Sequence, residues 1–248
     1  MWEIYDDLID LIPEDLSVIE CLIGLHWTLV RSETGIGAAM TLKGGKTEAD
    51  LVNIAGMPLK KLAACVKSWN LLQASLGQAA INSVLNTPEN VLRITGKPLE
   101  ITSEPEEANG FNEFLPEITG KKVAVIGHFP QIEELGRVCR LSIMEREPQA
   151  GDYPDLANEY ILPQQDYVFI TGTALINKTM PRLLELCKNT KTIIVGPSAP
   201  LSPLLFKHGV EAIASMVILD YKNAWQAVQE GGKMKVFKKW GQMLCVRG

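Results

Sequence analysis

Apolar residues in the second half of the chain occur in short runs that alternate with segments of helical periodicity. Five runs contain almost no polar residue, which is typical of parallel strands that are buried on both faces. We expect these strands at 123–127, 141–145, 167–171, 192–196 and 212–219, and helices at 132–139, 156–162, 178–188, 203–208 and 224–230. The pattern predicts an α/β fold with a Rossmann-like parallel sheet covered by helices.

The first half of the chain has a different pattern. An amphipathic helix is expected at 2–11, and a long strand at 18–31 is expected to turn and return as a second strand at 36–42. Two helices should follow, at 59–67 and 71–85. These elements predict a small α+β domain.

The texture of the sequence changes between about residues 97 and 122. This stretch has several prolines and acidic residues and little periodicity, as linkers between domains often do. We therefore predict two domains, with residues 1–100 forming the α+β domain and residues 101–248 the Rossmann-like α/β domain.

The predicted helix at 71–85 contains no charged residue, whereas a helix that faces solvent normally carries several. Its neutral polar residues Ser75, Gln78, Asn82 and Asn86 share one stripe at helical spacing. Two interpretations are open. The stripe is either a partly solvated face or homodimer contact, or the wall of a polar cleft that includes Asn82.

Composition narrows the class of protein. The 248 residues are 46% hydrophobic with a net charge of -5, enough for one large or two ordinary globular domains. Lys and Arg are scattered, so no nucleic-acid partner is expected. The acidic N-terminus and the lack of a long apolar run predict a cytoplasmic protein with no membrane partner. Five widely spaced cysteines without a Cys-x-x-Cys pair indicate reduced thiols.

Small and polar residues follow four of the predicted parallel strands. Ligands of open parallel sheets bind beyond the carboxyl ends of the strands, so these residues nominate a site for a small-molecule ligand. The candidates are Gly127, His128 and Phe129; Glu145, Asp152, Tyr153 and Asp155; Thr171, Gly172, Thr173 and Asn177; Gly196, Pro197, Ser198 and Ser202; and Asn82 from the first half.

His128 is the only histidine at the carboxyl end of a predicted strand, which makes it the candidate for proton transfer or metal ligation. Asp152 and Asp155 belong either to a surface turn or to the site. In the site, one of them would lie opposite His128 as a general acid or base, or would accept hydrogen bonds from a heterocycle. His128 could also bind a divalent or heavy-metal ion. No ligand spacing typical of a metal site accompanies it, so the sequence leaves this question open.

Glu145 follows Gly127 by 18 residues, about where a Rossmann fold places the acid that binds a ribose hydroxyl. The Gly-x-Gly-x-x-Gly loop that would hold a pyrophosphate is missing. NAD is therefore not expected, while a methyltransferase or another nucleotide-dependent enzyme remains an alternative.

Four segments in order resemble a known family of unknown biochemical function, described as "putative heavy-metal chelation". They are VAVIGHFP (123–130), EREPQAGDYPD (145–155), TGTALINKT (171–179) and VGPSAPLSP (195–203). The first half, with GLHWT (24–28) and AAIN (79–82), is similar to the small domain that precedes these segments in the family. The resemblance implies an enolase-N-terminal-like domain, then a Rossmann-like domain, with the active site between them.

What the resemblance implies about function is a role in making or breaking a small metal-chelating compound that is pterin-like, flavin-like or siderophore-like. Our leading hypothesis is a small-molecule enzyme, with condensation or hydrolysis of a heterocycle as the favoured reaction. In it Thr173, Asn177 and Ser198 orient the substrate and the uncharged helix closes the cleft. A non-catalytic protein that sequesters a metal or metal complex is the second hypothesis.

Overall fold

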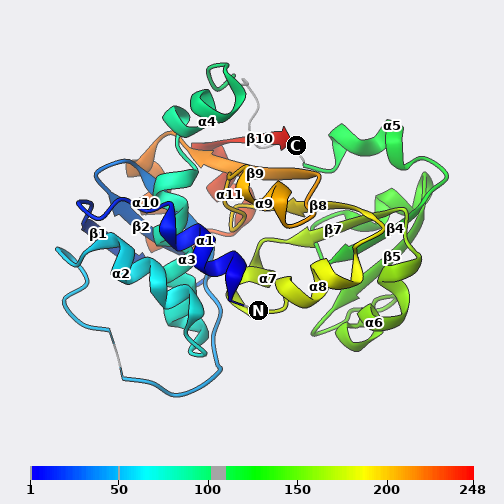
Figure 1. Ribbon diagram of the computed structural model, residues 1–248, viewed down its shortest axis with the longest axis horizontal. Coiled ribbons are helices and arrows are strands. Elements are labelled where there is room, and N and C mark those ends of the chain that lie inside the picture. Colours follow the sequence, from blue (N-terminus) through cyan, green and yellow to red (C-terminus); the bar gives the residue numbers. More distant parts are fainter. Residues whose placement is uncertain (1, 50, 102–109) are drawn as a thin grey trace.

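The fold of the computed structural model, which describes residues 2–49, 51–101 and 110–248, contains two β-sheets that lie side by side (Figure 1). The small sheet is an antiparallel meander of β1 (Val18–Ile23), β2 (Trp27–Ser32) and β3 (Ile36–Met40). The large sheet has seven strands in the order β10-β9-β8-β7-β4-β5-β6. Its strands are β4 (Lys122–Ile126), β5 (Arg140–Glu145), β6 (Tyr153–Pro154), β7 (Tyr167–Thr171), β8 (Lys191–Val195), β9 (Ala212–Ile218) and β10 (Gly241–Arg247).

The large sheet confirms the predicted Rossmann-like architecture. Strands β4 to β9 pair in parallel, and β10 pairs antiparallel with β9 at one edge. The chain runs outward from β4 through β5 to β6 and then returns to β7 on the other side of β4. This reversal between β4 and β7 creates a topological switch point, where ligands of doubly wound folds bind.

Helices pack around both sheets. They are α1 (Glu3–Asp10), α2 (Leu59–Ala63), α3 (Leu71–Leu85), α4 (Pro88–Thr95), α5 (Leu115–Ile118), α6 (Asn158–Ile161), α7 (Thr173–Ile176), α8 (Met180–Leu186), α9 (Leu204–Lys207), α10 (Tyr221–Gln229) and α11 (Met234–Phe237). Short 3-10 helices occupy 64–67, 112–114, 132–137, 155–157, 162–164 and 238–240. The predicted helix after β4 is thus a 3-10 helix, entered through Gln131 in the left-handed conformation (φ 61°).

The single long strand predicted at 18–31 is wrong, because the chain turns between β1 and β2. The backbone N–H of Gly24 donates to the carbonyl of Trp27 at 2.9 Å and closes the turn. A side chain at Gly24 would lie 2.5 Å from Cγ1 of Val228, so the close approach of α10 requires glycine there. The apolar run therefore contributes two strands to the small sheet.

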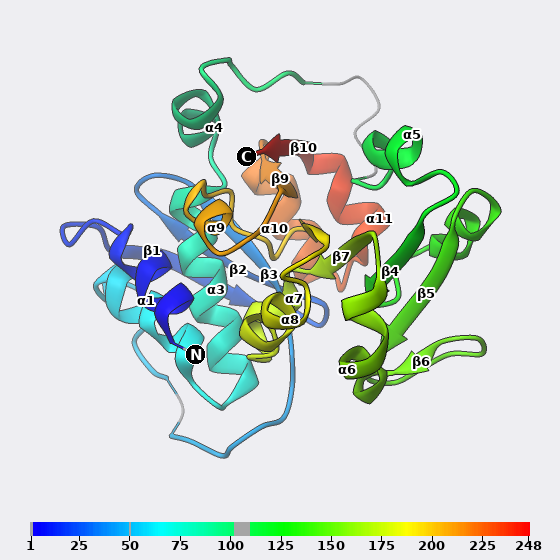
Figure 2. The ribbon, with the colours of Figure 1, turned by 45° about the vertical axis from the view of Figure 1, so that its right-hand side comes forward.

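Helix α3 lies against the small sheet and α7, and nearly all of its residues are buried (Figure 2). A side chain at Gly37 of β3 would lie 2.1 Å from the carbonyl oxygen of Ala79, which shows how closely helix and sheet approach. The capping side chain of Asn70 accepts hydrogen bonds from the N–H groups of Leu72 and Gln73 and fixes the start of the helix.

The polar stripe of α3 is buried and is not a solvated face. Oγ of Ser75 accepts a hydrogen bond from the N–H of Leu42 at 3.0 Å. Asn86 donates to the carbonyl of Ala199 at 3.0 Å and accepts from the N–H of Leu201 at 2.8 Å. Ser75 and Asn86 thus bind backbone after β3 and in the loop after β8, and Gln78 donates to the side chain of Asn82. Helix α3 carries no charge because its surroundings are protein.

The main hydrophobic core draws on both halves of the chain. It includes Leu76 and Ile81 of α3 together with Ile170 of β7, Leu175 of α7 and Ile194 of β8. The predicted division at residue 100 stands beside residues 102–109, which lie outside the described part of the chain, and it stays a prediction. No helix within the described ranges is long and apolar enough to cross a membrane.

Candidate functional site

A cavity of about 1210 Å³ opens at the carboxyl ends of the parallel strands. Its walls include His128 after β4, Thr171 at the end of β7 and Gly196 after β8, together with Trp27 and Met40 from the small sheet. The cavity therefore lies at the switch point between β4 and β7, with both sheets contributing to it. Its volume is sufficient for a small organic ligand.

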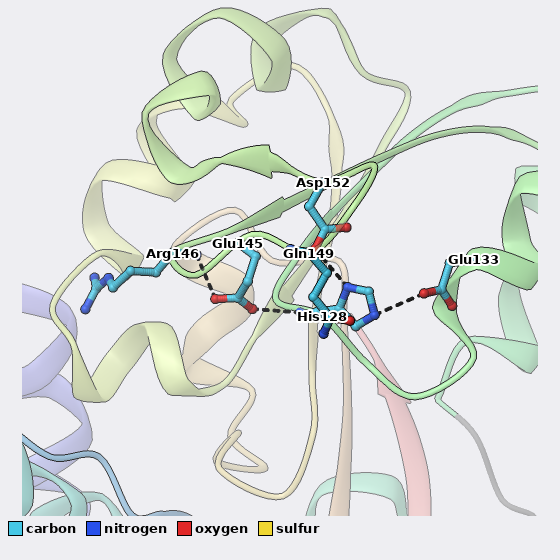
Figure 3. A network of polar contacts seen from close by, with 6 residues as sticks. All are labelled: His128, Glu133, Glu145, Arg146, Gln149 and Asp152. Atoms are coloured by element: carbon cyan, nitrogen blue, oxygen red, sulfur yellow. Dashed lines mark hydrogen bonds and ion pairs between the residues drawn. The ribbon is translucent and has the colours of Figure 1, made fainter.

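His128 and Asp152 form a hydrogen-bonded pair beside this cavity (Figure 3). Nδ1 of His128 lies 2.9 Å from Oδ2 of Asp152, whose side chain is only 2% exposed. The same Oδ2 accepts the backbone N–H of Gln149 at 3.0 Å, which fixes the carboxylate within the loop before β6. The loop thus presents a buried acceptor that orients the imidazole ring.

The other nitrogen of His128, Nε2, lies 3.1 Å from Oε1 of Glu133. Glu133 belongs to the 3-10 helix at 132–137, and its side chain is mostly exposed, whereas that of His128 is 15% exposed. When Nδ1–H donates to Asp152, Nε2 can accept a proton and, once protonated, donate to Glu133. The arrangement of a buried carboxylate, an oriented imidazole and an outer carboxylate is suited to general acid–base chemistry.

Glu145 at the end of β5 holds the loop after β4 in place. Its Oε2 accepts the backbone N–H of His128 at 2.8 Å, and its Oε1 accepts the N–H of Arg146 at 2.7 Å (Figure 3). Gly127 makes the turn possible, since its φ of 104° is in the region that favours glycine. The carboxylate that would bind a ribose in a dinucleotide fold thus accepts hydrogen bonds from the backbone on both oxygens.

The 3-10 helix at 132–137, after β4, also differs from the α-helix whose N-terminus would hold a pyrophosphate in a dinucleotide fold.

The cavity brings together most of the residues that the sequence nominated. Those that line it are Gly127, His128, Phe129, Glu145, Asp155, Thr171, Thr173, Asn177, Gly196, Pro197 and Ser198. Asp152 lies behind His128, while Asp155 is 3.7 Å from Nε of Arg146. Of the two aspartates left open by the sequence, Asp152 is therefore the one that contacts the imidazole.

The remaining nominated residues lie outside the cavity walls. Asn82 is fully buried, and its Nδ2 donates to the carbonyls of Ala38, Pro197 and Ser198. Tyr153 is exposed on β6. A side chain at Gly172 would lie 2.4 Å from the backbone nitrogen of Ala199, and Oγ of Ser202 accepts the N–H of Leu204 at the start of α9. Asn82, Gly172 and Ser202 thus shape the loops around the site.

Four of the lining residues make hydrogen bonds that shape or connect the loops after β7 and β8. Oγ1 of Thr171 lies 3.0 Å from Oγ1 of Thr173. Oδ1 of Asn177 accepts from the N–H of Thr179 at 3.1 Å and so shapes the turn into α8. Oγ of Ser198 accepts the N–H of Met40 at 2.9 Å, which joins the loop after β8 to the small sheet.

Sequence reasoning missed Lys178, which lies next to Asn177 and lines the cavity. Only 7% of the surface of this residue is exposed, and its Nζ donates a hydrogen bond to the carbonyl of Ile176 at 2.6 Å. Burial lowers the pKa of its amine to about 8. The one signal in the sequence was its position in a loop that follows a parallel strand, because nothing in the sequence marks a lysine as buried.

A resident metal ion would need several donor side chains close together. Among the described residues, no group of three or more His, Cys, Asp or Glu side chains is placed to bind a metal. Both ring nitrogens of His128 already face carboxylates. The cysteines Cys21, Cys65, Cys139, Cys187 and Cys245 lie away from the cavity walls, and burial raises the pKa of each thiol. These residues do not fit a bound metal ion of the protein's own.

Comparison with known proteins shows the family of the chain. Residues 109–246 match a family model described as "putative heavy-metal chelation", and residues 5–85 match a second model with the same description. The chain belongs to this family. A relative in Methanocaldococcus jannaschii, described as an uncharacterized protein, is 32% identical over an alignment of 244 residues that covers 91% of this chain and 88% of the relative.

Two solved structures of the family share the fold. A protein with unknown function from the DUF364 family of Desulfitobacterium hafniense is 40% identical and superposes with a TM-score of 0.90, covering 100% of this chain and 99% of that one. A second family member, from Pyrococcus horikoshii, is 22% identical with a TM-score of 0.80 and covers 99% and 98% of the two chains. The first extends the family likeness over the whole chain, and the second shows the shared fold.

Proposed function

We propose that the protein is an enzyme that acts on a small molecule in the cavity between the two sheets, with His128 as the residue that transfers a proton. The observation that carries this proposal is the His128–Asp152 pair, in which a buried carboxylate lies 2.9 Å from one ring nitrogen. A fixed carboxylate of this kind sets the tautomer and orientation of a catalytic imidazole. A purely structural pair would not need to border a cavity of this size.

The substrate class follows from the family description, which associates these proteins with heavy-metal chelation. We propose a compound that chelates a metal, of pterin-like, flavin-like or siderophore-like chemistry, with hydrolysis or condensation as the reaction. Phe129 and Trp27 supply apolar area to the cavity walls, which suits a flat heterocycle. Because the donor set does not fit a resident ion, any metal would enter as cargo of the chelator.

The proposed activity can be tested by incubating the protein with a small-molecule extract. Mass spectrometry then follows which compounds are consumed and which are formed. Wild-type protein is expected to convert at least one compound, and Asp152→Asn and His128→Gln to slow that conversion by about a hundredfold or more. His26→Gln is the matched control, since His26 belongs to the turn between β1 and β2 and lies outside the cavity walls.

Binding is measured in parallel, by thermal shift with pterin-6-carboxylate, riboflavin and 2,3-dihydroxybenzoate, each with and without ferric ion. Binding without conversion, unchanged by both substitutions at the pair, would favour a non-catalytic protein that sequesters a metal complex. Conversion at wild-type rates in Asp152→Asn and His128→Gln would show that the pair has no catalytic role.

A further inference from the structure

Lys178 is held in an unusual position for a lysine. It lies between α7 and α8, in the segment that follows β7, and its backbone is left-handed with a φ of 68°. Lysine is seldom buried unless it is paired, and non-glycine residues seldom adopt this backbone conformation. The fold thus places this amine in the cavity wall at a cost in free energy.

Two of the other basic residues around the cavity, Arg182 and Arg146, have acidic partners. Arg182 is paired with Glu159 at 2.5 Å and with Glu185 at 2.9 Å. Arg146 lies 3.7 Å from Asp155. For Lys178, by contrast, no carboxylate of the described chain lies within 4 Å of Nζ, and its one hydrogen bond goes to the carbonyl of Ile176. An ammonium group has three N–H donors, so two remain for a ligand.

The negative charge of Glu48 raises the pKa of this amine, but burial lowers the pKa by a larger amount. Glu48 is itself engaged, since its Oε2 accepts a hydrogen bond from Oγ of Ser68 at 2.6 Å. A buried ammonium without a close counter-charge is unfavourable, and an anion that enters the cavity would remove that cost.

We propose that Lys178 binds an anionic group of the ligand, a carboxylate or a phosphate, inside the cavity. The proposal rests on the proposed function, in that the same molecule is the one on which His128 acts. The anion accepts the two free N–H donors of Lys178 and supplies the missing negative charge. Substrates of this site are therefore small molecules that carry an acidic group, and neutral analogues bind more weakly.

The first test measures anion binding with inorganic phosphate and with malonate as separate probes, by titration calorimetry and thermal shift. Wild-type protein is expected to bind at least one of the two anions, and Lys178→Met to weaken that binding about tenfold or more. Lys188→Met is the matched control, because Lys188 is exposed beyond the end of α8 and outside the cavity walls. The preferred probe distinguishes a phosphate ligand from a carboxylate ligand.

The second test observes the amine itself by NMR of protein labelled with ¹³C at the ε-carbon of lysine. The pKa of Lys178 is expected to rise when the preferred anion is added, since the anion favours the charged form. The proposal is overturned if neither anion binds, if Lys178→Met binds as tightly as wild type, or if the Lys178 resonance is unchanged. His128→Gln should keep the Lys178-dependent response, so this result and the proton-transfer test can fail independently.

Discussion

Asn82 and Ser198 lie 116 residues apart in the chain, yet Nδ2 of Asn82 donates a hydrogen bond to the carbonyl oxygen of Ser198 at 3.2 Å. The same amide donates to the carbonyl of Ala38 at 2.8 Å. One buried side chain on α3 thus connects the small sheet with the loop after β8, and that loop forms a wall of the cavity.

Asn82→Ala is expected to lower the free energy of unfolding by about 2 to 4 kcal/mol, because it leaves buried carbonyl groups without a donor. Urea unfolding at 25 °C measures this loss. Asn189→Ala, at an exposed position, should change stability by less than about 0.5 kcal/mol. A stable Asn82→Ala protein that had lost ligand binding alone would instead favour a direct role of Asn82 in the cleft.

Gly37→Ala is expected to destabilise the protein by about 3 kcal/mol or more, because its new methyl group would lie 2.1 Å from the carbonyl oxygen of Ala79 and force α3 away from β3. Gly56→Ala is the comparison, since Gly56 has a φ of 81° and open space around it. Its cost should be about 1 kcal/mol, from the backbone conformation alone. Equal losses in urea unfolding would contradict the close packing of helix on sheet.

Lys178→Met is expected to raise the free energy of unfolding at pH 7 by about 2 kcal/mol. Its folded pKa is about 8 and its ordinary value 10.5, and solvent in the cavity reduces the effect below the full 1.4 kcal/mol per pKa unit. Below pH 8 both states hold the proton and the whole cost of burial is present. Between pH 8 and 10.5 the folded state has released the proton while the unfolded state keeps it. The free energy of unfolding of the wild type therefore rises with pH, and its difference from Lys178→Met becomes smaller.

Urea unfolding of wild type, Lys178→Met and Lys188→Met at pH 7 and pH 10 checks this dependence. The difference between wild type and Lys178→Met should shrink at the higher pH, while that for Lys188→Met stays constant. A constant difference at position 178 would mean that the amine is not desolvated in the folded protein.

Cys245 is expected to react slowly with iodoacetamide at pH 8, at least about a hundredfold more slowly than a free thiol. Burial and the nearby Glu113 carboxylate raise its pKa to about 12, so little thiolate is present. Mass spectrometry of the alkylated protein measures the rate, and addition of urea should remove the protection. Rapid alkylation of the folded protein would restore the thiols as candidate ligands for a soft metal.

The parallel strands were predictable because their side chains face protein on both sides, as in β7, where four of five residues are buried. Strand β10 was missed although residues 243–246 (MLCV) are apolar, because it is an antiparallel edge strand with half-buried positions that lies outside the alternation of parallel strands and helices. The turn at Gly24 was missed because the apolar run continues across it, and the contact that requires glycine there is with Val228, about two hundred residues further along the chain.

In the candidate site, too, some features could be predicted from local sequence and others depend on distant segments. The position of His128 followed from the rule that ligands bind beyond strand ends, and the structure places Asp152 against it. The buried state of Lys178 and the bonds of Asn82 depend on segments that are distant in sequence, about which local periodicity carries no information. Side-chain chemistry could be nominated from the sequence, whereas the partner of each group could not.

The core shared by the two halves has a consequence for how a ligand reaches the cavity. Tyr5 of α1 donates its hydroxyl to the carbonyl of Leu175 of α7 at 3.0 Å, and both side chains belong to the same apolar cluster. Swinging the small sheet away from the large one would expose that cluster to water, at a cost close to that of unfolding. We therefore expect ligands to enter and leave past exposed side chains of the cavity wall, such as Leu156, without a hinge motion of the two sheets.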